Sequence, residues 1–363
     1  MDVNKLAEFN IGEDLDQLMN IDPRGYGVCR VLYRGSRTYM GEPLAMKCAK
    51  RMDETLQQED IVYIITGFVL LPHKHGEMDG IIGAMLLARM LVKAYGAKPI
   101  LICPKECEDA VEKLAKVVGL HLYEEPAQMK AMPIAVGRIV FTKEEEEAKE
   151  QAERIMKSLP PKAVIAIEAP GANEKGVYHN AKGQNVTKIE AKTDILFGKC
   201  KAAGILNIAI GDLGNELGMG TIKAHLQKFV PYMENNGCSC GCGGGSAAEL
   251  AAEYIITATV SHWGVEAMIA ALAWLHRKPE WIHTKEMEME AIKTASNCGM
   301  VDMYGWLEYA IDGIGIEFHV NLLELMRQCV VISLGQFEHC SDWYEKVMEK
   351  KFFELEAQMD GED

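Results

Sequence analysis

The chain has 363 residues, of which 48% are hydrophobic, and its formal net charge is −15 at pH 7. This length allows one large α/β domain with additions or two domains, and the acidic balance argues against nucleic acid, which favours clustered Lys and Arg. No apolar run approaches the roughly 18 residues of a membrane span, and the first residues lack the pattern of a signal or transit peptide. We therefore expect a cytoplasmic protein with no nucleic-acid or membrane partner.

Runs of β-branched residues alternate with stretches of helical periodicity, after a helical and irregular lead-in. The runs typical of buried strands are 61–68, 98–103, 163–168, 206–211 and 254–260. Helical spacing occupies 80–95, 106–118, 190–203 and 261–275, a charged helix is predicted around 143–150, and residues 284–358 are mainly helical. Alternation of this kind indicates βαβ units. We predict an α/β, Rossmann-like fold with a doubly wound, mainly parallel sheet, helices on both faces and a mostly helical C-terminal part.

The same pattern suggests a division of the chain into three parts. Residues 1–60 form the lead-in and pack on the main domain, residues 61–335 form the α/β domain, and residues 336–363 form a C-terminal helix with an acidic tail. The apolar segment 317–334 packs either internally or against a second copy, so a homo-oligomer is an open alternative.

Four of the predicted strands end in polar residues or glycine. These ends are Thr66-Gly67, Glu168, Gly211-Asp212 and Ser261-His262. Because the carboxyl ends of parallel strands meet at one edge of a sheet, we expect a single cleft there. The densest stretch, Gly211–Gly220, matches neither a dinucleotide-binding glycine motif nor a phosphate loop. Within it, Asp212 and Glu216 lie four residues apart, and a helix beginning near Gly214 would present both to the cleft.

Several blocks of the sequence, taken in order, resemble the D-glutamate cyclase family. They are Asp22-Pro-Arg-Gly25, Thr66-Gly-Phe68, Glu77-Met-Asp-Gly-Ile-Ile-Gly-Ala84, Ile167-Glu-Ala-Pro-Gly171, Tyr178-His-Asn-Ala-Lys-Gly183, Gly211–Gly220, Ser261-His-Trp-Gly264, Val301-Asp302 and Ile311-Asp-Gly313. The resemblance covers roughly residues 15 to 335. The chain departs from the family pattern at Met78, Ile81-Ile82, Ala169, Lys182 and His262, where the family has Thr, Pro-Pro, Arg, Arg and Asn.

The resemblance implies reversible dehydration of D-glutamate to 5-oxo-D-proline, in which the α-amine attacks the γ-carboxyl carbon and water leaves. A carboxylate is a poor electrophile, and a divalent cation would offset its charge. Carboxylate and amide oxygens suit a hard cation, so we expect Mg²⁺ or Mn²⁺. The expected metal ligands are Asp212, Glu216 and Glu168. The expected catalytic residues are Asp212, Glu168, Asp79 and His262.

The remaining candidates are expected to bind the substrate. Arg24 and Lys182 would hold its carboxylates, and the others are Thr66, Gly67, Asn180, Gly211 and Asn215.

Most of these residues also have a purely structural interpretation. Asp79 is placed to cap the helix that follows it, Glu168 to hold loop amides, and Asp212 and Asn215 to form turns. Glu216 suits the first turn of a helix, and His262 suits a buried, hydrogen-bonded position. Functional roles for His179, Asp302 and Asp312 are left open. Alternative functions are a metal-dependent hydrolase of a lactam or phosphate ester and a non-catalytic protein that binds an amino-diacid.

Eleven cysteines occur in the chain, and in an intracellular protein we expect them to be reduced. Three of them, Cys238, Cys240 and Cys242, alternate with other residues in a glycine-rich stretch. This spacing is tighter than the usual Cys-x-x-Cys of zinc sites, and no second pair complements it. The sequence therefore favours a flexible surface loop with incidental thiols, with a metal site as the alternative.

Overall fold

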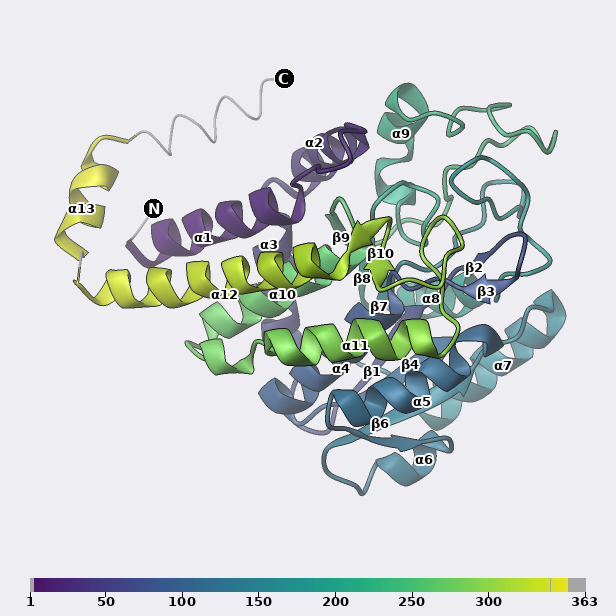
Figure 1. Cartoon of the computed structure of the whole chain (residues 1–363), viewed down its shortest axis with the longest axis horizontal. Coiled ribbons are helices and arrows are strands. Elements are labelled where there is room, and N and C mark those ends of the chain that lie inside the picture. Colours follow the sequence, from purple (N-terminus) through teal and green to yellow (C-terminus); the bar gives the residue numbers. More distant parts are fainter. Residues whose placement is uncertain (1–2, 340, 352–363) are drawn as a thin grey trace.

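A seven-stranded parallel sheet forms the centre of the computed structural model, which describes residues 3–339 and 341–351 (Figure 1). The strand order is β5-β6-β4-β1-β7-β8-β9. The strands are β1 (Ile61–Thr66), β4 (Lys98–Cys103), β5 (His121–Tyr123), β6 (Ala135–Val140), β7 (Ala163–Ile167), β8 (Leu206–Gly211) and β9 (Tyr254–Thr257). This arrangement confirms the predicted doubly wound α/β fold.

The four central strands are predicted well because their sequences are continuous apolar runs. Every residue of β1, β4, β7 and β8 is buried, as expected for parallel strands covered on both faces. Strands β5 and β6 were not predicted. In β6 the apolar run is interrupted by Gly137 and by Arg138, whose guanidinium lies 2.9 Å from Glu108 and 3.0 Å from Glu124. Strand β9 ends at Thr257, three residues earlier than predicted.

The winding of the sheet reverses between β1 and β7. From β1 the chain moves to β4 on one side, and it later returns to β7 on the other side. Ligand sites of open α/β sheets lie at the carboxyl ends of the strands beside such a reversal. Thr66, Glu168 and Asp212 end or follow the neighbouring strands β1, β7 and β8.

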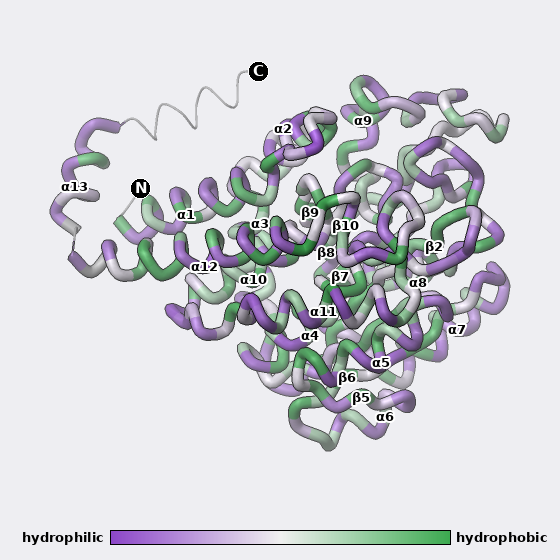
Figure 2. The backbone as a smooth tube through the Cα atoms, viewed as in Figure 1, coloured by the Kyte–Doolittle hydropathy of each residue, from purple (hydrophilic) through white to green (hydrophobic). Residues whose placement is uncertain are grey.

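Helices cover both faces of the sheet, as the fold predicts (Figure 1). On one face lie α3 (Leu44–Thr55), α4 (Ile81–Tyr95), α5 (Glu108–Val117) and α10 (Ser261–Leu275). A further layer outside them comprises α1 (Val3–Met19), α11 (Lys285–Asn297) and α12 (Ile316–His339). The opposite face is covered by α7 (Glu145–Ser158) and α8 (Thr193–Ala202). Hydrophobic residues gather along the strands in the middle of the molecule (Figure 2).

The remaining α-helices of the described residues and two hairpins lie at the edges of this core. They are α2 (Val28–Met40), α6 (Pro126–Met129), α9 (Lys223–Phe229), α13 (Ser341–Glu349), and two hairpins, β2 (Val69–Leu70) with β3 (His75–Gly76) and β10 (Ala310–Ile311) with β11 (Ile314–Gly315). Helix α12 runs through residue 335, and residues 340 and 352–363 of the predicted C-terminal helix and acidic tail (336–363) lie outside the described residues. Within the described ranges, no helix combines the length and apolarity needed to cross a membrane.

A buried carboxylate joins the N-terminal helices. Asp16 on α1 is fully buried and accepts hydrogen bonds from the backbone N–H groups of Leu44 (2.6 Å) and Ala45 (3.1 Å). It thereby caps α3, whose preceding residue, Pro43, offers no side-chain cap. Burial raises the pKa of Asp16 to about 7.

The pKa of Asp16 makes the stability of this region depend on pH. Because the folded pKa lies above the unfolded value, the native state holds the proton more tightly, and this stabilising contribution is lost as pH rises through about 7. We expect the urea midpoint of the wild type to fall more between pH 5 and pH 8 than that of Asp16→Asn, which does not titrate. Glu150→Gln on α7, an exposed carboxylate, should behave like the wild type. Parallel pH dependences of the wild type and Asp16→Asn would contradict this account.

Candidate active site

A cavity of about 420 Å³ lies at the carboxyl ends of β1, β7 and β8, within the range of small-molecule sites. Segments that are far apart in the sequence form its walls. Its polar lining includes Arg24, Glu77, Glu168, Asn180, Lys182, Asp212, Asn215, Glu216 and Asp312. The structure thus brings together acidic residues that sequence analysis placed at separate strand ends.

The loop after β8 is organised by Glu216. The Glu216 carboxylate accepts hydrogen bonds from the backbone N–H groups of Asp212 (3.1 Å), Leu213 (2.7 Å) and Gly214 (2.5 Å). The predicted helix near Gly214 is wrong, because these amides bond to Glu216 and the next helical turn begins only at Gly220. A Cβ atom at position 211 would lie 2.9 Å from the Glu216 carboxyl carbon, so any larger residue would displace this carboxylate.

Two groups of carboxylates share Asp212. The oxygens of Glu168, Asp212 and Glu216 lie within 4.8 Å of one another, and so do those of Asp79, Asp212 and Asp312. Ser261 Oγ donates to Glu168 Oε2 at 2.6 Å, whereas the Asp212 carboxylate has no hydrogen-bond donor among the described residues. Both groups offer only oxygen ligands, which suit a hard divalent cation.

The backbone at Glu168 is strained. Its φ of +41° is unusual for a residue with a side chain. Strained backbone of this kind is concentrated at functional sites, where the surrounding structure holds it in place.

Negative charge in this cavity is only partly neutralised. Burial raises the pKa values of Glu77, Glu168 and Asp212 well above their usual range, and neighbouring carboxylates raise them further. Arg24 supplies a positive charge through a 2.9 Å ion pair with Asp312, and it also donates to the carbonyl oxygen of Thr259 at 2.5 Å. A cluster with this excess of acid must hold protons or bind a cation.

Asp79 lies beneath the cavity and contacts backbone. Its carboxylate accepts hydrogen bonds from the N–H groups of Gly80 (2.6 Å), Ser261 (2.9 Å) and His262 (2.8 Å). Asp79 therefore holds the start of α10 against the start of α4. Burial raises the pKa of Asp79 to about 7, and the charge of Asp312 adds to this effect.

His262 points away from the cavity into a separate buried cluster. Its Nε2 lies 2.7 Å from Glu288 and 3.5 Å from Glu266, and Glu288 also contacts His283 at 2.8 Å. Burial alone would lower the pKa of His262, but the Glu288 and Glu266 carboxylates raise it well above its usual value. The structure therefore does not bring the His262 ring together with the other candidate catalytic groups.

The candidate substrate-binding residues divide into two groups. Asn180, Lys182, Asn215 and Arg24 line the cavity. Asn215 Nδ2 donates to the carbonyl oxygen of His179 at 3.0 Å, while its Oδ1 is buried without a partner among the described residues. Thr66, Gly67 and Gly211 do not line the cavity and instead shape the strand ends around it.

Asp22, Glu77 and Asp312 also line the cavity, although the sequence did not single out Asp22 or Glu77 as site residues and left the role of Asp312 open. Glu77 lies in the family-like block 77–84. Its position two residues before Asp79 is the feature of the sequence that could have marked it as a site residue. Asp312 lies in the turn between β10 and β11 with φ +55°, and it reaches the site by pairing with Arg24, 288 residues earlier. Asp302, by contrast, accepts hydrogen bonds from Tyr304 and Trp306 amides and holds a loop.

Comparison with known proteins identifies the family. A family model described as D-glutamate cyclase-like, C-terminal, matches residues 15–327, and the chain belongs to this family. Over 200 residues it is 32% identical to human (Homo sapiens) "D-glutamate cyclase, mitochondrial", an alignment that covers 48% of this chain and 30% of the human protein. Because that name places the human protein in mitochondria, the cytoplasmic location expected for this chain stays a prediction.

Substitution of His262 tests whether its role is structural. His262→Gln breaks a buried ion pair, so we expect it to lower the free energy of unfolding by about 3–5 kcal/mol. The folded pKa of His262 is raised, so the wild type's advantage should be greatest below about pH 6.5 and shrink as pH rises. Urea unfolding at pH 6 and pH 9 measures this, with exposed His121→Gln as the control. If His262→Gln were as stable as the wild type but had lost enzymatic turnover, His262 would instead take part in the chemistry.

Proposed function

We propose that this protein is a lyase that interconverts D-glutamate and 5-oxo-D-proline in the carboxylate-lined cavity. Family membership and the human relative's name support the reaction class. The observation that carries the proposal is the convergence of Glu77, Glu168, Asp212 and Glu216 on one cavity of suitable size. An amino-diacid and a divalent cation together complement such a cavity in charge.

Substrate recognition is assigned to the polar groups of the cavity wall. The unpartnered Asn215 Oδ1 is an acceptor for the substrate ammonium group. Lys182, exposed at the rim, and Arg24, partly engaged by Asp312, provide positive charge for the substrate carboxylates. Arg is the stronger bidentate clamp, so Lys182 is assigned the weaker, more adaptable contact.

Glu168, Asp212 and Glu216 are the groups that would hold the cation. All three line the cavity, and their oxygens converge. Mg²⁺ or Mn²⁺ matches this all-oxygen ligand set. When bound, such an ion supplies Lewis acidity that offsets the negative charge of the γ-carboxylate.

Glu77 is assigned the proton transfers. The substrate ammonium loses two protons when the lactam nitrogen forms, and the departing γ-oxygen gains two protons to become water. One carboxyl group that accepts and returns protons therefore balances the reaction. Burial and the Asp312 charge raise the pKa of Glu77, as this role requires, and its carboxylate has no hydrogen-bond donor among the described residues.

Asp212→Asn tests the metal-binding assignment. We expect turnover of D-glutamate in the presence of Mn²⁺ to fall by about 100-fold or more, since loss of a charged ligand should exceed the 10–100-fold effect of losing an outer partner. Mass spectrometry follows the loss of one water from the substrate, and circular dichroism checks the fold. Asp109→Asn, an exposed residue of α5, serves as the control. Wild-type turnover by Asp212→Asn would remove this residue from the mechanism.

Glu77→Gln tests the proton-transfer assignment. Because the pKa of Glu77 is raised, wild-type kcat should increase with pH through a midpoint well above the usual range of Glu. In the variant, kcat should no longer rise with pH in this way, and its value should be lower by about 10²–10⁴-fold. A Glu77→Gln profile that keeps the same rise would assign the proton transfers to another group.

A further inference from the structure

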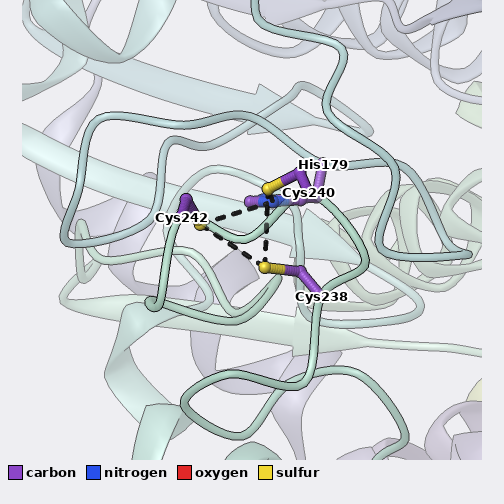
Figure 3. A group of neighbouring side chains, drawn as sticks. All are labelled: His179, Cys238, Cys240 and Cys242. Carbon is purple, nitrogen blue, oxygen red and sulfur yellow. Dashed lines mark hydrogen bonds between the residues drawn. The ribbon is translucent and has the colours of Figure 1, made fainter.

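The three alternating cysteines form a compact cluster with a histidine from a distant loop (Figure 3). Cys238 Sγ lies 3.5 Å from Cys240 Sγ and 3.4 Å from Cys242 Sγ. His179 Nε2 lies 3.2 Å from Cys240 Sγ and 3.8 Å from Cys242 Sγ. All four atoms lie within 4.8 Å of one another. The sequence favoured incidental thiols here, because the fourth member lies about 60 residues earlier in the chain.

These separations match the edges of a small tetrahedron. Zinc binds thiolate sulfur at about 2.3 Å and imidazole nitrogen at about 2.0 Å, which places neighbouring ligand atoms roughly 3.3–3.8 Å apart. A disulfide would require two sulfurs at about 2.05 Å, and the three described thiols are free. Three sulfurs and one nitrogen are also the ligand chemistry that zinc prefers.

The surrounding structure directs these atoms toward one point. Gly241 and Gly243 have φ values of +75° and +85°, which allow the chain to fold back sharply around Cys242. The buried Asn173 side chain donates through Nδ2 to Cys242 Sγ at 3.3 Å and to the carbonyl oxygen of Gly245 at 2.7 Å. An N–H donor to the sulfur is the outer support that a metal-bound thiolate commonly has.

The cluster lies directly behind one wall of the active-site cavity. The carbonyl oxygen of His179 accepts the hydrogen bond from Asn215 Nδ2, and Asn180, Lys182 and Gln184 line the cavity. Ser239 also donates to the carbonyl oxygen of Gly183 at 3.3 Å, so the two loops are already in contact. A link between His179 and the cysteines would fix this wall in position.

We propose that His179, Cys238, Cys240 and Cys242 bind one zinc ion, which fastens the 179–184 wall of the cavity to the 238–242 loop. On binding, the three thiols lose their protons to solvent, and His179 coordinates through neutral Nε2. The role is structural, because four protein ligands complete the tetrahedral shell and leave no open position. The site is separate from the carboxylate group, which offers only oxygen ligands.

Metal analysis of the full-length protein tests this proposal directly. We expect inductively coupled plasma mass spectrometry to find one tightly held zinc per chain after dialysis against a weak chelator. Cobalt-substituted protein should show thiolate-to-cobalt charge-transfer bands and the intense visible bands of tetrahedral Co²⁺. Because these measurements use the wild type, they do not depend on the folding of any variant. Absence of zinc and of the cobalt bands, a disulfide within the cluster, or iron with inorganic sulfide would each overturn the proposal.

Variants locate the ion. Cys242→Ser and His179→Asn should lose the zinc, whereas Cys298→Ser, a thiol of similar partial exposure elsewhere, should keep it. Asp212→Asn should also keep it, which separates this site from the carboxylate site. Hydrogen exchange of the zinc-free wild type should increase in 179–184 and 238–242 and stay unchanged in β1 and β4. Zinc retained by both Cys242→Ser and His179→Asn, or exchange unchanged on zinc removal, would contradict the assigned ligands or role.

Discussion

Mutual repulsion and burial of the carboxylates that gather at the ends of β7 and β8 are the constraint on which the rest of the site depends. Glu168 and Asp212 follow neighbouring strands, and Glu216 returns from the next loop to stand beside them. Burying such charges is costly unless they are paired, protonated or bound to a metal. The fold meets part of this cost through Arg24, the Ser261 hydroxyl and the amides of the 212–214 loop. The remaining charge is available for a cation and a substrate.

Neighbouring parts of the molecule hold this arrangement in place. Asp79 clamps the start of α10 to the start of α4, and His262 anchors the first turn of α10 to Glu288 on α11. Asn215 contacts the His179 backbone in the loop that lines another part of the cavity wall, and we propose that the His179 and cysteine cluster holds this loop. Two ligand chemistries are thus kept apart, with oxygen groups inside the cavity and sulfur groups behind its wall.

The sequence predicts the sheet and the acidic strand ends because both depend on local patterns. Continuous apolar runs mark β1, β4, β7 and β8, and parallel topology then brings Glu168 and Asp212 to one edge. Contacts between residues that are far apart in the sequence cannot be predicted in this way. Nothing local to Asp312 signals its contact with Arg24, and nothing near Cys238 signals His179. The predicted helix at Gly214 failed because the Glu216 side chain competes for the same amides, an alternative that residue spacing alone does not reveal.

The central claim is that Glu168, Asp212 and Glu216 bind a divalent cation that the reaction needs. Anomalous diffraction from crystals soaked in Mn²⁺ tests it most directly, because the signal locates the ion independently of any activity assay. The account predicts a manganese peak among these three carboxylates, with Asp212 as a ligand, and loss of that peak in Asp212→Asn crystals. A cavity free of manganese at saturating concentration, or a peak elsewhere with the three side chains unmoved, would contradict it.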